Sequence, residues 1–191
     1  MYSNILLGLL AAIGLGIWLV ERDGKGDLGD QIGDALVTLT TSEEHRLSQL
    51  ESETQAQVRA LVQSLKNDGL DIFVGSTLRT QAAEKAAIAS GHSAVKTHSW
   101  HELGRAADLY PVNPDTAAPD LEGIRDDLFV QMQQRAVELG FHQIAYNDDW
   151  SRRYITTSKG KTWDGGHVEW HGPYDTIALA VEAEGAYYGI A

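Results

Sequence analysis

Histidine and acidic side chains gather in two short stretches that lie far apart along the chain. The stretches hold His92, His98, His101 and Asp108, and then Asp164, His167, Glu169 and His171. The sequence contains no cysteine, so a transition metal could be held only by imidazole nitrogens and carboxylate oxygens. Catalytic zinc commonly takes three protein ligands and leaves one position for water. The two stretches therefore predict a shared metal centre, for which Zn²⁺ is favoured and Mn²⁺ or Co²⁺ remain open.

Within the first stretch, the segment SWHELGRAAD places His101 and Asp108 seven positions apart. Gly104 permits a tight turn between them, and the small side chains of Ala106 and Ala107 allow the backbone to pack closely beneath a metal. We expect His101 and Asp108 to be ligands. The residues alone leave open the alternative of a histidine and an aspartate on a surface turn.

The second stretch, WDGGHVEWHGP, offers His167 as the third ligand. Asp164 precedes it across a Gly-Gly turn and is the preferred general base beside a metal-bound water. Glu169 shares a strand face with His167, and it is either the rival base or the group that orients a ligand histidine. His171 and His98 remain rival ligands.

Three ordered blocks of the sequence resemble the M15 class of zinc peptidases. The pattern S-x-H-x-x-G-x-A-x-D begins at Ser99, and an acid-x-x-His-x-Glu element begins at Asp164. The segment VGSTLRTQAAE resembles the strand, turn and arginine that precede the second helix of that class. The resemblance covers residues 41–175. Gly166 stands where proline is usual and Val168 where phenylalanine is usual, and neither change removes a ligand.

The resemblance implies an α+β fold and a set of roles. It implies that His101, Asp108 and His167 hold Zn²⁺ and that Asp164 is the base in metal-assisted amide hydrolysis. It also implies that Arg79 binds the substrate and stabilises the developing oxyanion.

The M15 class contains phage L-alanyl-D-glutamate endopeptidases and D-alanyl-D-alanine carboxypeptidases. An endolysin-like peptidase that cuts the L-Ala–D-Glu bond of the peptidoglycan stem peptide is the preferred function. A D-Ala-D-Ala carboxypeptidase of bacterial wall metabolism and a non-catalytic, membrane-tethered virion protein are the alternatives. The formal net charge of −12 argues against a nucleic-acid partner.

Residues 5–20, ILLGLLAAIGLGIWLV, form an uncharged run that spans about 24 Å as a helix. This is short for a hydrocarbon core of roughly 30 Å but usable where the bilayer is thin. An uncleaved inner-membrane anchor is favoured over a cleaved signal peptide, because no basic residue precedes the run and no small-residue cleavage site follows it. A buried soluble helix is disfavoured because the run has no polar face.

The small residues Gly8, Ala12 and Gly16 fall on one face of this expected helix and could support self-association in lipid. We expect residues 1–22 to be the anchor, residues 23–40 a Gly/Asp-rich linker and residues 41–191 the peptidase domain. The catalytic domain would face the periplasm, with a virion-associated enzyme as a further possibility.

The peptidase domain is predicted to be α+β, with a small, mostly antiparallel sheet and helices packed on one side. A capping box at residues 41–44 predicts a helix that ends near Gly69. The further expected helices are 80–90, 121–140 and 174–185, the last capped by Asp175. The expected strands are 70–76, 106–111, 141–146 and 167–170, with a loop at 114–119.

Overall fold

The structure is a computed structural model that describes residues 42–90, 98–157 and 159–190. The expected anchor and linker, the self-association stripe and His92 lie outside these residues. No helix in the described part of the chain has both the length and the apolar character needed to cross a membrane.

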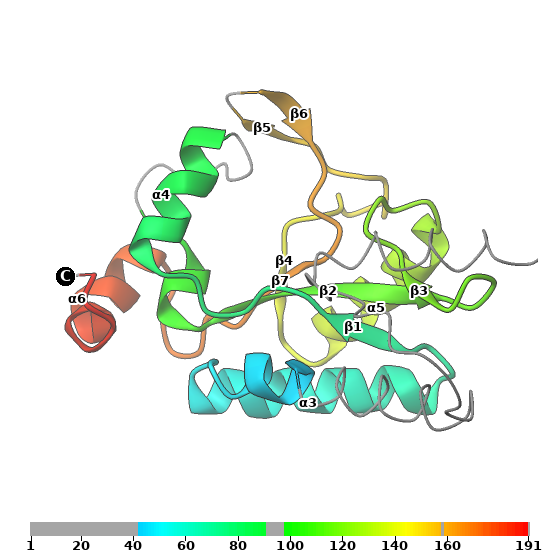
Figure 1. Ribbon diagram of the computed structural model, residues 1–191, viewed down its shortest axis with the longest axis horizontal. Coiled ribbons are helices and arrows are strands. Elements are labelled where there is room, and N and C mark those ends of the chain that lie inside the picture. The colour runs from blue at the N-terminus through cyan, green and yellow to red at the C-terminus, as the bar shows by residue number, and fades with distance from the viewer. Residues whose placement is uncertain (1–41, 91–97, 158, 191) are drawn as a thin grey trace, which may run out of the picture. The chain divides into compact units, whose positions relative to one another are not determined.

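A small antiparallel sheet forms the centre of the domain (Figure 1). Its strands run in the order β1, β2, β7 and β4, with β3 paired to the end of β2. The bounds are Ile72–Val74 for β1, Ala106–Asn113 for β2, Ala118–Pro119 for β3, His142–Gln143 for β4 and His167–Glu169 for β7. Strands β5 (Ile155–Thr157) and β6 (Gly160–Thr162) form a separate two-stranded sheet. The predicted antiparallel α+β architecture is therefore confirmed.

Helices α3 (Ser52–Asn67) and α5 (Asp126–Glu138) pack against each other and against the sheet. Their apolar positions enter one core with the inward side chains of the strands. This core includes Val58, Leu61, Leu65, Phe129, Met132, Leu109 and Val168. Helices α4 (Gln81–Ser90) and α6 (Ile177–Tyr188) and the 3₁₀ helix η1 (Trp100–Leu103) complete the described elements.

The alternation of side chains along β2 separates the core from the site. Ala107 and Leu109 are fully buried in the core, whereas Asp108 between them points to the opposite face. Strand β7 repeats the pattern, with Val168 in the core between His167 and Glu169. One face of the sheet therefore stabilises the fold, and the other carries the polar residues.

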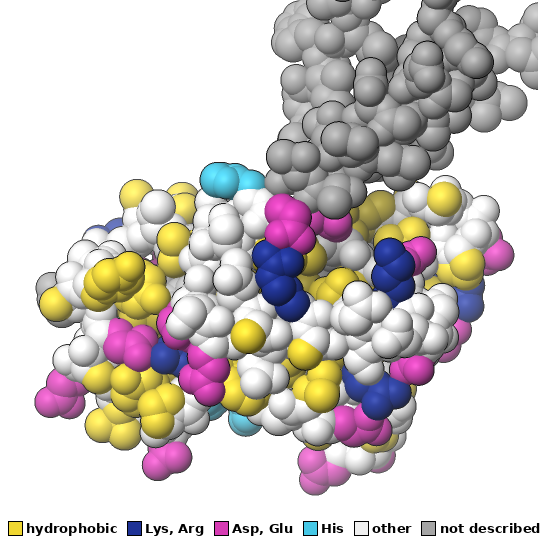
Figure 2. Space-filling model, turned by 90° about the horizontal axis from the view of Figure 1, so that it is seen from below, with side chains coloured by type: hydrophobic (Ala, Val, Ile, Leu, Met, Phe, Trp, Pro, Cys, Tyr) yellow, Lys and Arg dark blue, Asp and Glu magenta, His cyan; other side chains and the backbone are white. Residues whose placement is uncertain are grey.

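The surface agrees with the acidic composition. On the face seen in Figure 2, Asp and Glu side chains are scattered beside single Lys and Arg side chains.

The predicted single helix from residue 41 to Gly69 is wrong. Residues 42–47 are helical, the chain breaks at residues 48–51, and α3 begins at Ser52. The Glu51 carboxylate accepts hydrogen bonds from the backbone N–H groups of Glu53 and Thr54, which makes it the N-cap of a new helix. The predicted left-handed residue after the helix is confirmed, because Gly69 has φ +83°.

Four other features of the fold differ from the sequence prediction for local reasons. Helix α5 starts later than residue 121, because the Asp120 carboxylate accepts from the N–H groups of Ile124 and Arg125 and holds the preceding turn. Helix α6 is capped by Thr176, whose hydroxyl accepts from a backbone N–H, and not by Asp175.

The predicted strand at 141–146 is reduced to His142–Gln143, since the Gln143 side chain binds the backbone of Tyr146 in a turn. The predicted loop at 114–119 contains β3, which pairs with the extended end of β2.

Candidate metal centre

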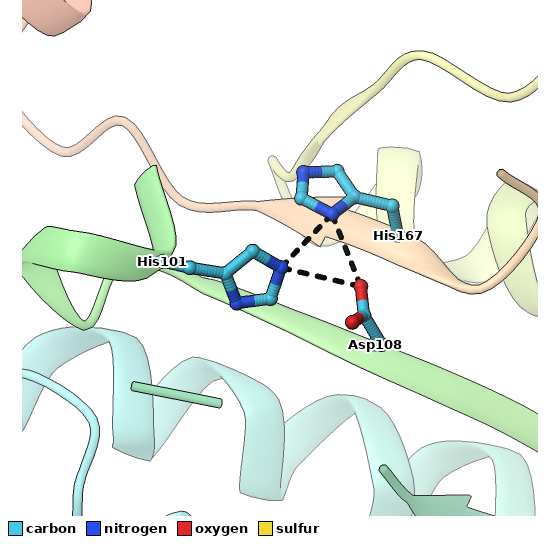
Figure 3. Close-up of side chains that lie close together, drawn as sticks. All are labelled: His101, Asp108 and His167. Atoms are coloured by element: carbon cyan, nitrogen blue, oxygen red, sulfur yellow. Dashed lines mark hydrogen bonds and ion pairs between the residues drawn. The ribbon is translucent and has the colours of Figure 1, made fainter. Parts of the chain in front are cut away.

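Three side chains from two remote segments meet on the polar face of the sheet (Figure 3). His101 Nε2 and His167 Nδ1 each lie 3.2 Å from Asp108 Oδ1, and the two nitrogens are 3.3 Å apart. All three side chains are buried. The structure therefore brings together the three residues that the sequence predicts as ligands.

The strand register places two of these residues side by side. Asp108 on β2 is directly opposite His167 on β7. The backbone N–H of Leu109 donates to the carbonyl of Gly166, so the adjacent position is a hydrogen-bonded pair. Asp108 and His167 therefore occupy a non-hydrogen-bonded pair, in which opposed side chains come closest.

His101 is supplied by η1, which ends at Gly104. Gly104 has φ +62°, and a Cβ there would lie 2.9 Å from the backbone nitrogen of Glu51. Glycine is thus required both for the left-handed turn and for the close packing. This turn reverses the chain between His101 and the strand that carries Asp108, as the sequence predicts.

The far nitrogen of each histidine is held by a protein acceptor. His101 Nδ1 lies 2.6 Å from the carbonyl oxygen of Thr77, and His167 Nε2 lies 3.0 Å from Glu169 Oε1. Because a carbonyl and a carboxylate only accept, both nitrogens must carry protons. In the neutral imidazoles the lone pairs of His101 Nε2 and His167 Nδ1 therefore face Asp108.

This arrangement fits a zinc ion. The lone pairs of His101 Nε2 and His167 Nδ1 and the anionic Oδ1 of Asp108 converge on one point. These three acceptors need a cation between them. Donors bound to one ion at about 2.0–2.1 Å with tetrahedral angles lie about 3.3 Å apart, and the three observed separations are 3.2–3.3 Å. Two imidazoles and a carboxylate, each oriented by an outer hydrogen bond, are a donor set that zinc accepts.

In the protein without metal, the surrounding carboxylates favour the protonated form of His167. Burial lowers the pKa of His167, but its hydrogen bonds with Asp108 and Glu169 outweigh burial and raise this pKa well above the ordinary value. Burial raises the pKa of Asp108, but His101 and His167 outweigh it and hold this pKa well below the usual range. The three side chains thus favour one positive charge between them, which a proton or a metal ion can supply.

Asp164 borders the triangle and has no hydrogen-bond partner for its carboxylate among the described residues. Burial raises its pKa, and the charge of Asp108 adds to this, whereas His167, His101 and Arg79 act in the opposite direction. The preceding Trp163 fixes the loop, since its indole N–H donates to the carbonyl of Ala145. Asp164 is thus a half-buried carboxylate with free acceptor capacity beside the candidate ion.

Arg79 reaches the same site from the segment after β1. Its Nη1 lies 2.8 Å from Glu84 Oε2, and its Nη2 lies 3.6 Å from Asp108 Oδ2. Glu84 on α4 is fully buried and also accepts a hydrogen bond from the Ser99 hydroxyl at 3.1 Å. Glu84, which is itself held by Ser99, therefore fixes the guanidinium with Nη2 toward Asp108.

Glu169 differs from Asp164 because both of its oxygens are engaged. Oε1 accepts from His167, and Oε2 lies 2.8 Å from His171 Nε2. Burial raises the pKa of Glu169, but the hydrogen bonds with the two histidines outweigh it and lower the pKa to about 2. This carboxylate orients His167 and is poorly suited to take up a proton.

The rival ligands lie outside the triangle. His98 Nδ1 lies 3.5 Å from Glu102 Oε2, and the His171 ring stacks on Trp100 with centroids 4.1 Å apart. The Thr77 carbonyl and Glu84 were not predicted from the sequence. The only sequence signal for Glu84 is its place on the helix that follows Arg79, and a backbone acceptor leaves no signal at all.

A buried His–Asp–His triangle with an adjacent carboxylate and an arginine defines a metal-dependent hydrolase centre. A family model described as phage L-alanyl-D-glutamate peptidase matches residues 38–170. The chain belongs to this family. It is a peptidase that acts on peptidoglycan, and the expected zinc cofactor agrees with the family and with the donor set.

Two solved structures are similar to this chain. The L-Ala D-Glu endopeptidase ChiX of Serratia marcescens is 19% identical, with a TM-score of 0.46, 66% of this chain covered and 84% of that chain. VanYB in complex with D-alanine-D-alanine is 18% identical, with a TM-score of 0.43, 73% of this chain covered and 77% of that chain. A search of curated proteins found no match.

Proposed function

We propose that this chain hydrolyses the L-Ala–D-Glu bond of peptidoglycan stem peptides with zinc as cofactor. The observation that carries the proposal is the buried triangle of His101, Asp108 and His167 with the unengaged carboxylate of Asp164 beside it. The family description supports the choice of bond.

Zinc held by the triangle supplies Lewis acidity toward the scissile carbonyl and lowers the pKa of water to about 7. Asp164 takes the proton of the attacking water and returns it to the leaving amine. Its free acceptor capacity supports the first step. Its raised pKa supports the second, because a carboxyl group that holds a proton more readily is a better general acid.

Arg79 is proposed to bind the peptide carbonyl and stabilise the negative charge that develops on it. The ion pair with Glu84 fixes this guanidinium before the substrate arrives, so little reorganisation is needed during the reaction. Glu169 keeps the Nε2 proton of His167 in place and thereby directs Nδ1 toward the metal.

The experiment is digestion of purified peptidoglycan by the full chain, followed by mass spectrometry of the products. Cleavage of L-Ala–D-Glu leaves L-alanine on the glycan and releases peptides with a new amino terminus on D-glutamate. A chelator should abolish the products and added zinc should restore them.

Two other outcomes would overturn the proposal. Release of free D-alanine would identify a D-Ala-D-Ala carboxypeptidase. Absence of any product from zinc-loaded protein would favour a non-catalytic virion protein.

We also propose that residues 1–22 anchor the enzyme in the inner membrane with the catalytic domain in the periplasm. The uncharged run at residues 5–20 supports this, and confinement beside the wall would raise the effective substrate concentration without a wall-binding module. The test is membrane fractionation of the full chain against a Leu10→Arg, Ile13→Arg variant, since each central arginine costs about 2.5–3.5 kcal/mol of insertion. Equal membrane fractions would contradict the anchor.

Cross-linking of a variant with leucine at Gly8, Ala12 and Gly16 would test self-association.

A further inference from the structure

A second group of histidine and carboxylate side chains lies next to the first on the polar face of the sheet. Strand β4 pairs with β7 so that His142 is directly opposite Glu169. His171 follows Glu169 by two residues, and its Nε2 lies 2.8 Å from Glu169 Oε2. One ligand atom from each of the three side chains lies within 4.8 Å of the others.

The two imidazoles of this group are held by stacking. The His142 and His171 rings stack with centroids 4.6 Å apart and an interplanar angle of 30°. Trp100 stacks on His171 at 4.1 Å. Trp100 is buried and holds the His171 ring by stacking on it, whereas His142 is exposed to solvent.

We propose that His142, Glu169 and His171 form a second, exchangeable binding site for a divalent transition metal. Two imidazoles and a carboxylate are the same donor set as in the first centre, and they suit Zn²⁺, Co²⁺ and Ni²⁺. His142 is exposed and the other two side chains are half-buried, so the site is reached directly from solvent. An exposed and less constrained donor set binds more weakly than the buried triangle.

The two centres share Glu169. Its Oε1 accepts from His167, a residue of the first triangle, and its Oε2 faces the second group. A metal on Oε2 draws the carboxylate toward His142 and His171 and weakens the hydrogen bond that orients His167. Excess metal should therefore inhibit the enzyme, a consequence that rests on the proposed peptidase function, whereas the second site itself does not.

The test is a zinc titration of the metal-stripped full chain in competition with a chromophoric chelator. The wild-type protein should bind two zinc ions per chain, one tightly and one more weakly. His142→Ala should bind only the tight ion. His45→Ala is the matched control, since His45 is an exposed histidine that belongs to neither group, and this variant should bind both ions. His101→Ala should lose the tight ion and keep the weak one.

One zinc ion per chain in the wild-type protein, or two in His142→Ala, would overturn the second site. Imidazole NMR signals give a reading that does not depend on activity: those of His142 and His171 should shift only in the second phase of the titration. In the activity assay, excess zinc should inhibit the wild-type enzyme and leave His142→Ala unaffected. If the enzyme has no peptidase activity at all, the stoichiometry still decides the proposal.

Discussion

The two histidine-carboxylate groups on the sheet have the same donors but differ in how these donors are held. In the first, His101 and His167 are buried, and each has its far nitrogen fixed by the Thr77 carbonyl or the Glu169 carboxylate. In the second, His142 is exposed and has no hydrogen-bond partner among the described residues. The comparison indicates that outer hydrogen bonds and burial, more than donor type, distinguish a permanent metal centre from an exchangeable one.

The groups also differ in their neighbours. Asp164 and Arg79 border the first triangle, and we propose that they supply a proton acceptor and a fixed positive charge. A metal in the second group would contact Glu169, whose other oxygen is committed to His167. The proposed hydrolysis therefore belongs to the first group, whereas the second group would act on the first only through Glu169.

The largest expected effect comes from His101→Ala. Removing a direct ligand should abolish tight zinc binding and reduce peptidoglycan cleavage to the uncatalysed background. This loss should exceed the roughly 10–100-fold that follows from removing an outer partner. Bound zinc after dialysis and the yield of muropeptides measure it. Full activity in this variant would show that the triangle is not the catalytic centre.

Asp164→Asn should separate metal binding from chemistry. The variant keeps the triangle and should retain one tight zinc ion, but it cannot take a proton from water. A loss of about 10²–10⁴ in kcat is expected, the usual contribution of a general base. The matched control is Asp175→Asn, an exposed aspartate outside the site, which should leave kcat unchanged. A small loss in Asp164→Asn, combined with a large one in Glu169→Gln, would exchange the roles of the two acids.

Arg79→Gln should lower kcat by about 10²–10³, the cost of one oxyanion donor, with zinc affinity nearly unchanged. Glu84→Gln keeps the shape of the buried side chain but removes the charge that holds Arg79. It should therefore lower kcat in the same direction and by less. An effect of Glu84→Gln on zinc affinity alone would contradict the positioning role.

The ligand triangle could be predicted because its signals are local. The spacing of His101, Gly104 and Asp108 marks a turn into a strand, and the alternation in β2 and β7 decides which side chains share a face. The two imidazoles that the sequence predicts to share one ion have ring centroids 5.0 Å apart, with their facing nitrogens 3.3 Å from each other.

Features that depend on non-local pairing could not be predicted. His142 carried no signal as a site residue, because its role depends on the register between β4 and β7. The break between residues 47 and 52 also escaped prediction, because the apolar period continues across it while the Glu51 carboxylate starts a new helix. Side-chain caps and backbone acceptors override a continuous hydrophobic pattern without changing it.

Glu169→Gln should affect both groups, which makes it the sharpest test of their connection. An amide can present its NH₂ group to His167, so the tautomer of that histidine is no longer fixed. Zinc affinity at the first centre should fall by about 10–100-fold. The second site should lose its only anionic donor and bind no zinc in the titration. Loss of the weak ion with an unchanged tight one would show that the two groups are independent.

The smallest expected effect is a difference in proton release. Because Asp108 and Glu169 raise the pKa of His167 well above its ordinary value, zinc must compete with a proton for this imidazole. The hydrogen bond with Glu169 contributes to this raised pKa, so Glu169→Gln lowers it and reduces the number of protons released. Calorimetry of zinc binding in two buffers of different ionisation enthalpy measures that number, and the wild-type protein should release up to about one proton more than the variant. Equal release would mean that His167 is held by Asp108 alone and that Glu169, although shared by the two groups, transmits little between them.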